Sequence, residues 1–130
     1  MSAMLYREPN QVKWVGVRPA HNGEQVAKSG TAVNNTVIIH TVTAGKNLYL
    51  VTAQIFTVNS VAAYGNLWVR DGADATWLYL GGLVSAAGQA IPGQTWYSYP
   101  PVEVPAGYDI CVVSTALAFN VVGSIFGWEE

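Results

Sequence analysis

The chain contains few side chains that could perform chemistry, and their spacing is unfavourable. His21 and His40 have no second ligand at a metal-binding spacing. Cys111 is the single cysteine, so no intrachain disulfide can form, and its apolar surroundings in the sequence predict a small buried residue rather than a nucleophile. No nucleophile elbow, phosphate loop or dinucleotide fingerprint is present. The sequence therefore predicts no metal site and no bound cofactor.

Four carboxylates are the remaining candidates for acid–base catalysis: Asp71, Asp74, Glu103 and Asp109. Hydrolysis of a glycosidic bond requires two such groups facing one bond. The sequence alone cannot place any two of them together. Asp71 and Asp74 flank Gly72 as in a hairpin turn, and the other ligand positions of a calcium loop are missing. A polysaccharide hydrolase is the weakest of three functional hypotheses, and we expect no enzymatic activity.

Aromatic side chains are the candidates for binding. Six of them could form a platform for stacking sugars, namely Trp68, Trp77, Tyr79, Trp96, Tyr97 and Tyr99. Such residues more often fill a sandwich core or a subunit interface. The sequence leaves both roles open.

The composition indicates one domain with an unusually uncharged surface. The chain has 130 residues, of which 51% are hydrophobic and 11% are charged, against a usual charged share of about 25%. Few charged side chains are available to solvate the exterior, so we expect other chains to cover much of it. The net charge of −2 and the six Lys and Arg residues argue against a nucleic-acid partner.

The apolar runs are too short for a membrane-spanning helix, which needs about 18 or more apolar residues. The first eleven residues, MSAMLYREPNQ, also lack the features of a secretory signal. We therefore expect no membrane association and synthesis in a cytoplasm.

Residues 34–130 are predicted to form an antiparallel β-sandwich. Seven strands are predicted, at 35–43, 48–58, 64–70, 76–84, 94–104, 108–115 and 119–128. With a short strand at 12–17 the count is about eight, which suits a jelly roll. Pro100 and Pro101 place their strand at an edge, a strand start or a bulge, and the last strand is expected to be central or covered. Residues 48–58 carry apolar side chains in both alternating sets, which suggests a second face covered by another subunit.

Residues 1–33 are predicted to form an extended arm, with Ser29-Gly30-Thr31 as a flexible joint. Through Lys46 the chain has five basic and two acidic residues, and after it one basic and six acidic residues. The arm is therefore chemically distinct from the body. Trp14 and Val15 are expected either to pack on their own domain or to reach a neighbouring surface.

Three motifs resemble small jelly-roll virion proteins of tailed bacteriophages, of the head-decoration, head-fibre and tail-fibre-tip types. They are VTAGKNLYLVTAQI from Val42, PPVEVPAGYDICV from Pro100, and VVGSIFGWEE from Val121. The resemblance implies a non-enzymatic virion protein, made in the host cytoplasm, that binds the particle surface as a homotrimer. The partner would be the major capsid protein or another virion protein. The alternative is a fibre tip or lectin-like module that binds a glycan or receptor.

The resemblance also assigns roles to particular residues. Trp14, Val15 and Arg18 would belong to the segment that anchors the trimer. Phe126 and Trp128 would contact the neighbouring subunit, and Tyr97 is a third candidate for that contact.

Overall fold

The computed structural model describes residues 23–58, 62–86 and 93–130. These residues form eight strands and no helix, which confirms the all-β prediction. The strands are β1 (Glu24–Val33), β2 (Thr36–Thr41), β3 (Leu48–Thr57), β4 (Ala63–Arg70), β5 (Thr76–Ser85), β6 (Gln94–Val104), β7 (Asp109–Ser114) and β8 (Asn120–Glu129). In this part of the chain, no helix is long and apolar enough to cross a membrane.

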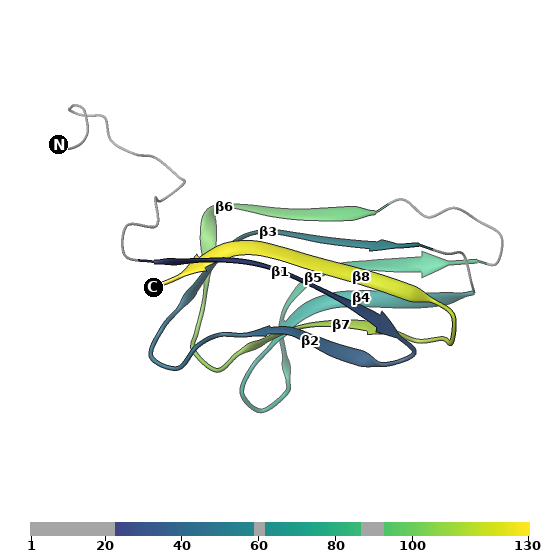
Figure 1. Ribbon diagram of the computed structural model, residues 1–130, viewed down its shortest axis with the longest axis horizontal. Coiled ribbons are helices and arrows are strands. Elements are labelled where there is room, and N and C mark those ends of the chain that lie inside the picture. The colour runs from purple at the N-terminus through teal and green to yellow at the C-terminus, as the bar shows by residue number, and fades with distance from the viewer. Residues whose placement is uncertain (1–22, 59–61, 87–92) are drawn as a thin grey trace.

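The strands form two four-stranded sheets that pack face to face (Figure 1). One sheet has the order β1-β8-β3-β6 and the other has the order β2-β7-β4-β5. Every strand pair is antiparallel. Only the β4–β5 connection stays within one sheet, and each of the others crosses between sheets. This winding is that of a jelly roll, as the sequence predicts.

The seven strands expected after residue 34 all form, with small differences at their ends. β6 is an edge strand, which accommodates Pro100 and Pro101 because proline cannot donate to a neighbouring strand. The Tyr99–Pro100 peptide bond is cis. β8 lies between β1 and β3, so the last strand is central, as predicted.

The first strand differs from the expectation. β1 occupies Glu24–Val33, within the range assigned to the arm, and pairs with β8 along its whole length. Ser29-Gly30-Thr31 is the middle of this strand rather than a flexible joint. β1 is an edge strand, and only its Val26 and Ala32 are fully buried. Its sequence therefore shows little of the apolar alternation that indicates a strand. The sandwich therefore begins by Glu24. The strand predicted at residues 12–17 lies outside the described residues.

A bulge in β3 explains its apolar residues in both alternating sets. The register with β6 and β8 shifts between Leu50 and Thr52, which reverses the alternation of the strand. Ala53 and Ile55 consequently join Leu50 in the core. Both alternating sets therefore contribute to one inner face, so the apolar pattern of β3 does not by itself require a covering subunit, and coverage of this sheet stays a prediction.

The core lies between the two sheets and holds their inward side chains. Its largest fully buried members are Phe119, Leu48, Leu50, Ile55, Leu67 and Ile110. Phe119 precedes β8 in the β7–β8 turn, where the Ser114 hydroxyl donates to its carbonyl oxygen at 2.6 Å. Alternate residues of each strand therefore face outward, on two opposite sheet surfaces.

The turn between β6 and β7 confirms the prediction from Pro105-Ala106-Gly107. Gly107 has a φ of 82°, a conformation that glycine adopts without a Cβ clash. Its amide donates to the carbonyl oxygen of Val42 at 2.9 Å, and the Tyr108 amide donates back to that of Pro105 at 3.3 Å. The turn is thus tied to the end of β2.

Candidate functional site

Aromatic side chains gather on the outer surface of the β1-β8-β3-β6 sheet. We call this set the aromatic face, and it consists of Tyr49, Tyr97, Tyr99, Phe126 and Trp128. Thr52 pairs with Tyr97 on β6 and with Phe126 on β8, so these two rings flank one position of β3. Tyr97 is 64% exposed and Phe126 is 36% exposed.

Ring contacts link the other members. Tyr49 pairs with Trp128 in the register, and their rings stack with centroids 6.3 Å apart. Tyr97 and Tyr99 stack at 6.4 Å with planes 4° apart. Trp128 is only 4% exposed, and its indole Nε1 has no hydrogen-bond partner within the described residues. The chain enters β1 beside this ring, since a Cβ at Gly23 would lie 3.1 Å from Trp128 Cδ1.

The centre of this sheet is uncharged on its outer surface. Glu129 is the one Asp, Glu, Lys, Arg or His residue in β3 and β8, and its side chain is buried. Glu103, on the edge strand β6, accepts a hydrogen bond from Asn47 Nδ2 at 2.6 Å. A charge-free surface with exposed aromatic rings is the composition typical of the centre of a protein interface.

Glu129 forms a polar link between the sheets at one end of the sandwich. Its Oε2 atom lies 2.5 Å from His40 Nε2 and accepts a hydrogen bond from the Thr43 amide at 3.1 Å. Burial alone would raise the pKa of Glu129, but the hydrogen bonds from Thr43 and His40 outweigh it and hold the pKa below its usual value. His40 therefore contacts a carboxylate. No group of acidic, histidine or cysteine side chains in the described residues could hold a metal ion.

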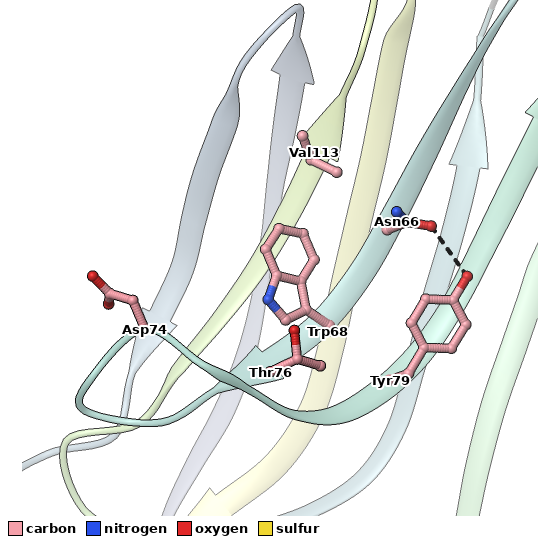
Figure 2. Close-up of a pocket in the computed structure, with 6 residues that line it drawn as sticks. All are labelled: Asn66, Trp68, Asp74, Thr76, Tyr79 and Val113. Carbon is pink, nitrogen blue, oxygen red and sulfur yellow. Dashed lines mark hydrogen bonds between the residues drawn. The ribbon is translucent and has the colours of Figure 1, made fainter.

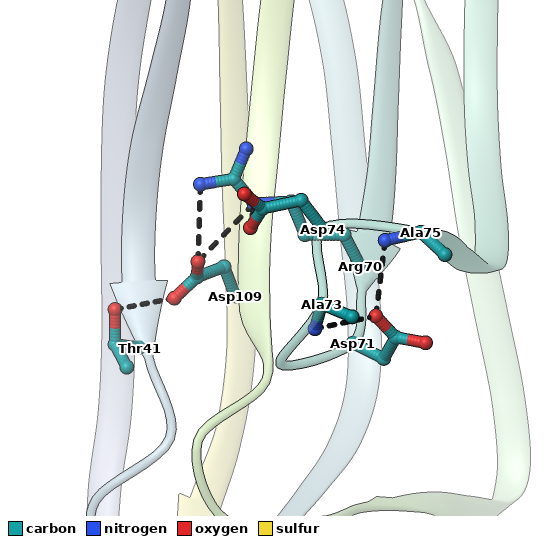
Figure 3. A network of polar contacts seen from close by, with 7 residues as sticks. All are labelled: Thr41, Arg70, Asp71, Ala73, Asp74, Ala75 and Asp109. Atoms are coloured by element: carbon teal, nitrogen blue, oxygen red, sulfur yellow. Dashed lines mark hydrogen bonds and ion pairs between the residues drawn. The ribbon is translucent and has the colours of Figure 1, made fainter.

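Three of the four candidate carboxylates lie together near the β4–β5 turn (Figure 3). Arg70 Nε lies 3.2 Å from Asp109 Oδ2 and 3.3 Å from Asp74 Oδ1. Asp109 also accepts a hydrogen bond from the Thr41 hydroxyl at 2.6 Å. Burial alone would lower the pKa of Arg70, but Asp109 and its acidic neighbours outweigh it and raise the pKa above its usual value.

The third carboxylate holds the turn itself. Asp71 Oδ1 accepts hydrogen bonds from the amides of Ala73 and Ala75 at 2.8 and 3.0 Å (Figure 3). The hairpin interpretation is therefore confirmed, although the residue with positive φ is Asp74, at 65°, rather than Gly72. Glu103 belongs to the opposite sheet. Within the described residues, these carboxylates are held by structural partners.

A pocket lies on the outer surface of the β2-β7-β4-β5 sheet (Figure 2). It has a volume of about 280 Å³ and is lined by Asn66, Trp68, Asp74, Thr76, Tyr79 and Val113. Trp68 lies in the middle, with Val113 on one side and polar groups on the others. The Tyr79 hydroxyl donates to Asn66 Oδ1 at 3.1 Å. The arrangement can bind a small ligand that has both an apolar face and hydroxyl groups.

Cys111, on β7, pairs with Ile38 and Trp68 in the register, so the three side chains lie on the same side of the sheet. It is fully buried, as predicted for a small apolar residue. Burial raises the pKa of its thiol. It is therefore a poor nucleophile.

The predicted interface and anchor residues fall into two groups. Tyr97, Phe126 and Trp128 share one sheet surface, but their role as a subunit contact stays a prediction. The anchor residues 14, 15 and 18 and His21 lie outside the described residues.

The six aromatic candidates for sugar stacking also separate. Trp68 and Tyr79 line the pocket, whereas Trp96 packs against the core. Trp77 makes an edge contact with Tyr108 at 5.2 Å. No sequence pattern points to Asn66, Thr76 and Val113, because only the register of β4, β5 and β7 brings them together.

Comparisons with known proteins identify no family. No family model matches the chain, and no curated protein matches it. One similar solved structure is a chain of the "Cyanophage Pam1 capsid asymmetric unit", with a TM-score of 0.41 and 13% sequence identity. The alignment covers 96% of this chain and 99% of that chain. This similarity is too weak to establish a shared fold, so the jelly-roll assignment rests on the strand order described above.

Proposed function

We propose that this chain is a non-enzymatic structural protein of a virion, which decorates and stabilises a capsid as a homotrimer. The observation that carries the proposal is the aromatic face. It combines exposed Tyr97 and Phe126 with two central strands that present no charge to solvent. Contiguous apolar surface of this kind marks a site of protein contact. The charged share of 11% in the whole chain supports extensive coverage by other chains.

Burial of the aromatic face would supply the driving force for assembly. Removing apolar surface from water contributes about 25 cal/mol per Å², and an aromatic side chain buries roughly 150–250 Å². Two exposed rings per subunit, Tyr97 and Phe126, would therefore contribute several kcal/mol before the cost of association is subtracted. No charged group on β3 or β8 would have to be desolvated at the centre of the contact, because Glu129 faces inward.

The segment before the sandwich is proposed to attach the trimer to the particle. The register pairs Glu24 with Glu129, so this segment joins the sandwich at the same end as the last residues of β8. Trp14, Val15 and Arg18 are the proposed anchor residues. A trimer would present three such segments from one side, and simultaneous attachment would strengthen binding to a repeating surface.

The proposal is tested on purified virions of the virus that carries this gene. We expect the chain to be present in many copies per particle and to rebind particles from which it has been stripped. Trp14→Ala with Arg18→Ala should abolish rebinding, while Glu24→Gln, an exposed change in β1, should leave it intact. Absence of the chain from the particles, or rebinding that is indifferent to both anchor changes, would contradict the proposal.

A further inference from the structure

The pocket centred on Trp68 lies on the sheet opposite the aromatic face. The two outer surfaces of a sandwich point in opposite directions. Contact between subunits through the aromatic face would therefore leave this pocket open to solvent. It is a separate feature, and the proposed function gives it no role.

Two aromatic rings from neighbouring strands form the apolar part of the pocket. Trp68 on β4 and Tyr79 on β5 are partners in the register, so their side chains lie side by side on the sheet surface. Trp68 is half-buried and Tyr79 is 56% exposed. Figure 2 shows both rings facing the same space, with the methyl groups of Val113 beyond Trp68. The flat C–H face of a pyranose ring packs well against such rings.

Polar groups surround the rings where the hydroxyl groups of a sugar would lie. The Tyr79 hydroxyl donates to Asn66 Oδ1, which leaves the amide nitrogen of Asn66 as a donor. Asp74 lies at the edge of the pocket, where its Oδ1 contacts Arg70 and its carboxylate points away from Trp68 (Figure 2). The Thr76 hydroxyl points toward Trp68 and can donate or accept. Apolar walls with a few oriented polar groups are typical of small-molecule sites.

The position of the Tyr79 ring depends on a glycine. A Cβ built on Gly82 would overlap the Tyr79 hydroxyl oxygen and would lie 2.8 Å from Asn66 Oδ1. Gly82 pairs with Asn66 in the register, on the strand that carries Tyr79. The missing side chain at Gly82 therefore makes room for the Tyr79–Asn66 hydrogen bond. This contact sets the orientation of both pocket residues.

Size and charge limit the ligand class. The volume of about 280 Å³ is just below the range for drug-sized ligands, which begins at roughly 300 Å³, and suits one monosaccharide unit. Asp74 is the one charged residue of the lining, so the pocket disfavours phosphate, sulfate and carboxylate groups. We propose that this pocket binds one neutral pyranose unit, either as a free sugar or as part of a larger glycan.

The test uses the full chain and two kinds of probe. Neutral methyl hexopyranosides are titrated individually by saturation-transfer NMR, and a glycan array with neutral, sialylated and sulfated members tests larger ligands. We expect saturable binding of at least one neutral hexose, with neutral members preferred on the array. Binding only on the array would show that the pocket takes the sugar within a larger glycan, which also satisfies the proposal.

Variants test whether the sugar binds in this pocket. Tyr79→Ser and Gly82→Ala should each weaken binding by about tenfold or more, and Trp68→Ala should abolish it. Trp77→Ala and Leu117→Ser change exposed apolar residues outside the pocket and should leave affinity unchanged. Because Tyr79 is exposed, Tyr79→Ser reports on binding even if Trp68→Ala fails to fold. The proposal is overturned if no neutral sugar binds saturably, or if the array shows a preference for anionic glycans. It is also overturned if the control variants lose as much affinity as the pocket variants.

Discussion

The side chain of Glu129, on the last strand, meets that of His40, on β2, with Oε2 and Nε2 2.5 Å apart. The contact joins the two sheets at the end of the sandwich where β1 begins. The Thr43 amide donates to the same carboxylate oxygen at 3.1 Å. A buried carboxylate with these partners stabilises the fold only while it is ionised, and stability should therefore depend on pH.

Glu129→Gln should lower the free energy of unfolding at pH 7 by about 1–3 kcal/mol, because it removes the charge from a buried hydrogen-bonded group. The folded-state pKa of Glu129 is lowered. Its contribution is therefore present above the ordinary glutamate pKa of about 4.3 and is lost as the pH falls through the lower folded-state pKa. Urea unfolding of both proteins between pH 7 and pH 3 measures this.

The matched control for this prediction is Glu24→Gln, whose side chain is 77% exposed. We expect that change to stay within about 0.5 kcal/mol. A difference between wild type and Glu129→Gln that is the same at pH 3 as at pH 7 would rule out the ionised link.

Arg70 should stabilise the fold more than a surface ion pair does. It holds Asp109 and Asp74 from a side chain that is 21% exposed. Arg70→Ala leaves two acidic groups without their cation, and we expect a loss of about 1–3 kcal/mol, between the values for exposed and buried pairs. Lys46→Ala removes an exposed contact of 3.9 Å with Glu24 and should cost no more than about 1 kcal/mol. Equal losses in the two variants would contradict this ranking.

Stability should depend more on the glycine in the β6–β7 turn, Gly107, than on the glycine in the β4–β5 turn, Gly72. Its φ of 82° is unfavourable for a residue with a Cβ, so Gly107→Ala should lower stability by about 1–2 kcal/mol. Gly72→Ala adds a Cβ with no atom within 4 Å and no positive φ, and should be neutral or slightly stabilising. Thermal unfolding of both variants measures the contrast. A Gly107→Ala protein as stable as Gly72→Ala would show that the turn tolerates the change.

Most of the sandwich could be predicted from the sequence because its strands are bounded by clear turn residues. The run after Pro105-Ala106-Gly107 is an example, since the turn and the apolar alternation of β7 agree. The sequence does not reveal β1 as a strand, because Val26 and Ala32 are its only fully buried residues. Its strand conformation depends on pairing with β8, about a hundred residues later in the chain. That pairing leaves no local signal.

The sites were harder to predict than the strands because they depend on register. The bulge between Leu50 and Thr52 determines which side chains of β3 face outward. No residue type in this strand predicts the bulge. The pocket requires Trp68 on β4 to pair with Tyr79 on β5, and the register between these two strands is also shifted by irregularities. The sequence could identify the aromatic residues as candidates. It could not separate the two sheet surfaces on which they lie.

The most direct test of the central claim is the solution mass of the full chain by size-exclusion chromatography with light scattering. We predict three times the chain mass of 13.9 kDa for the wild type and for Tyr79→Ser, whose changed residue lies on the opposite sheet. Tyr97→Ser combined with Phe126→Ser should give the mass of one chain with an unchanged circular dichroism spectrum. A monomeric wild type, or a trimer that survives the double change, would contradict assembly through the aromatic face.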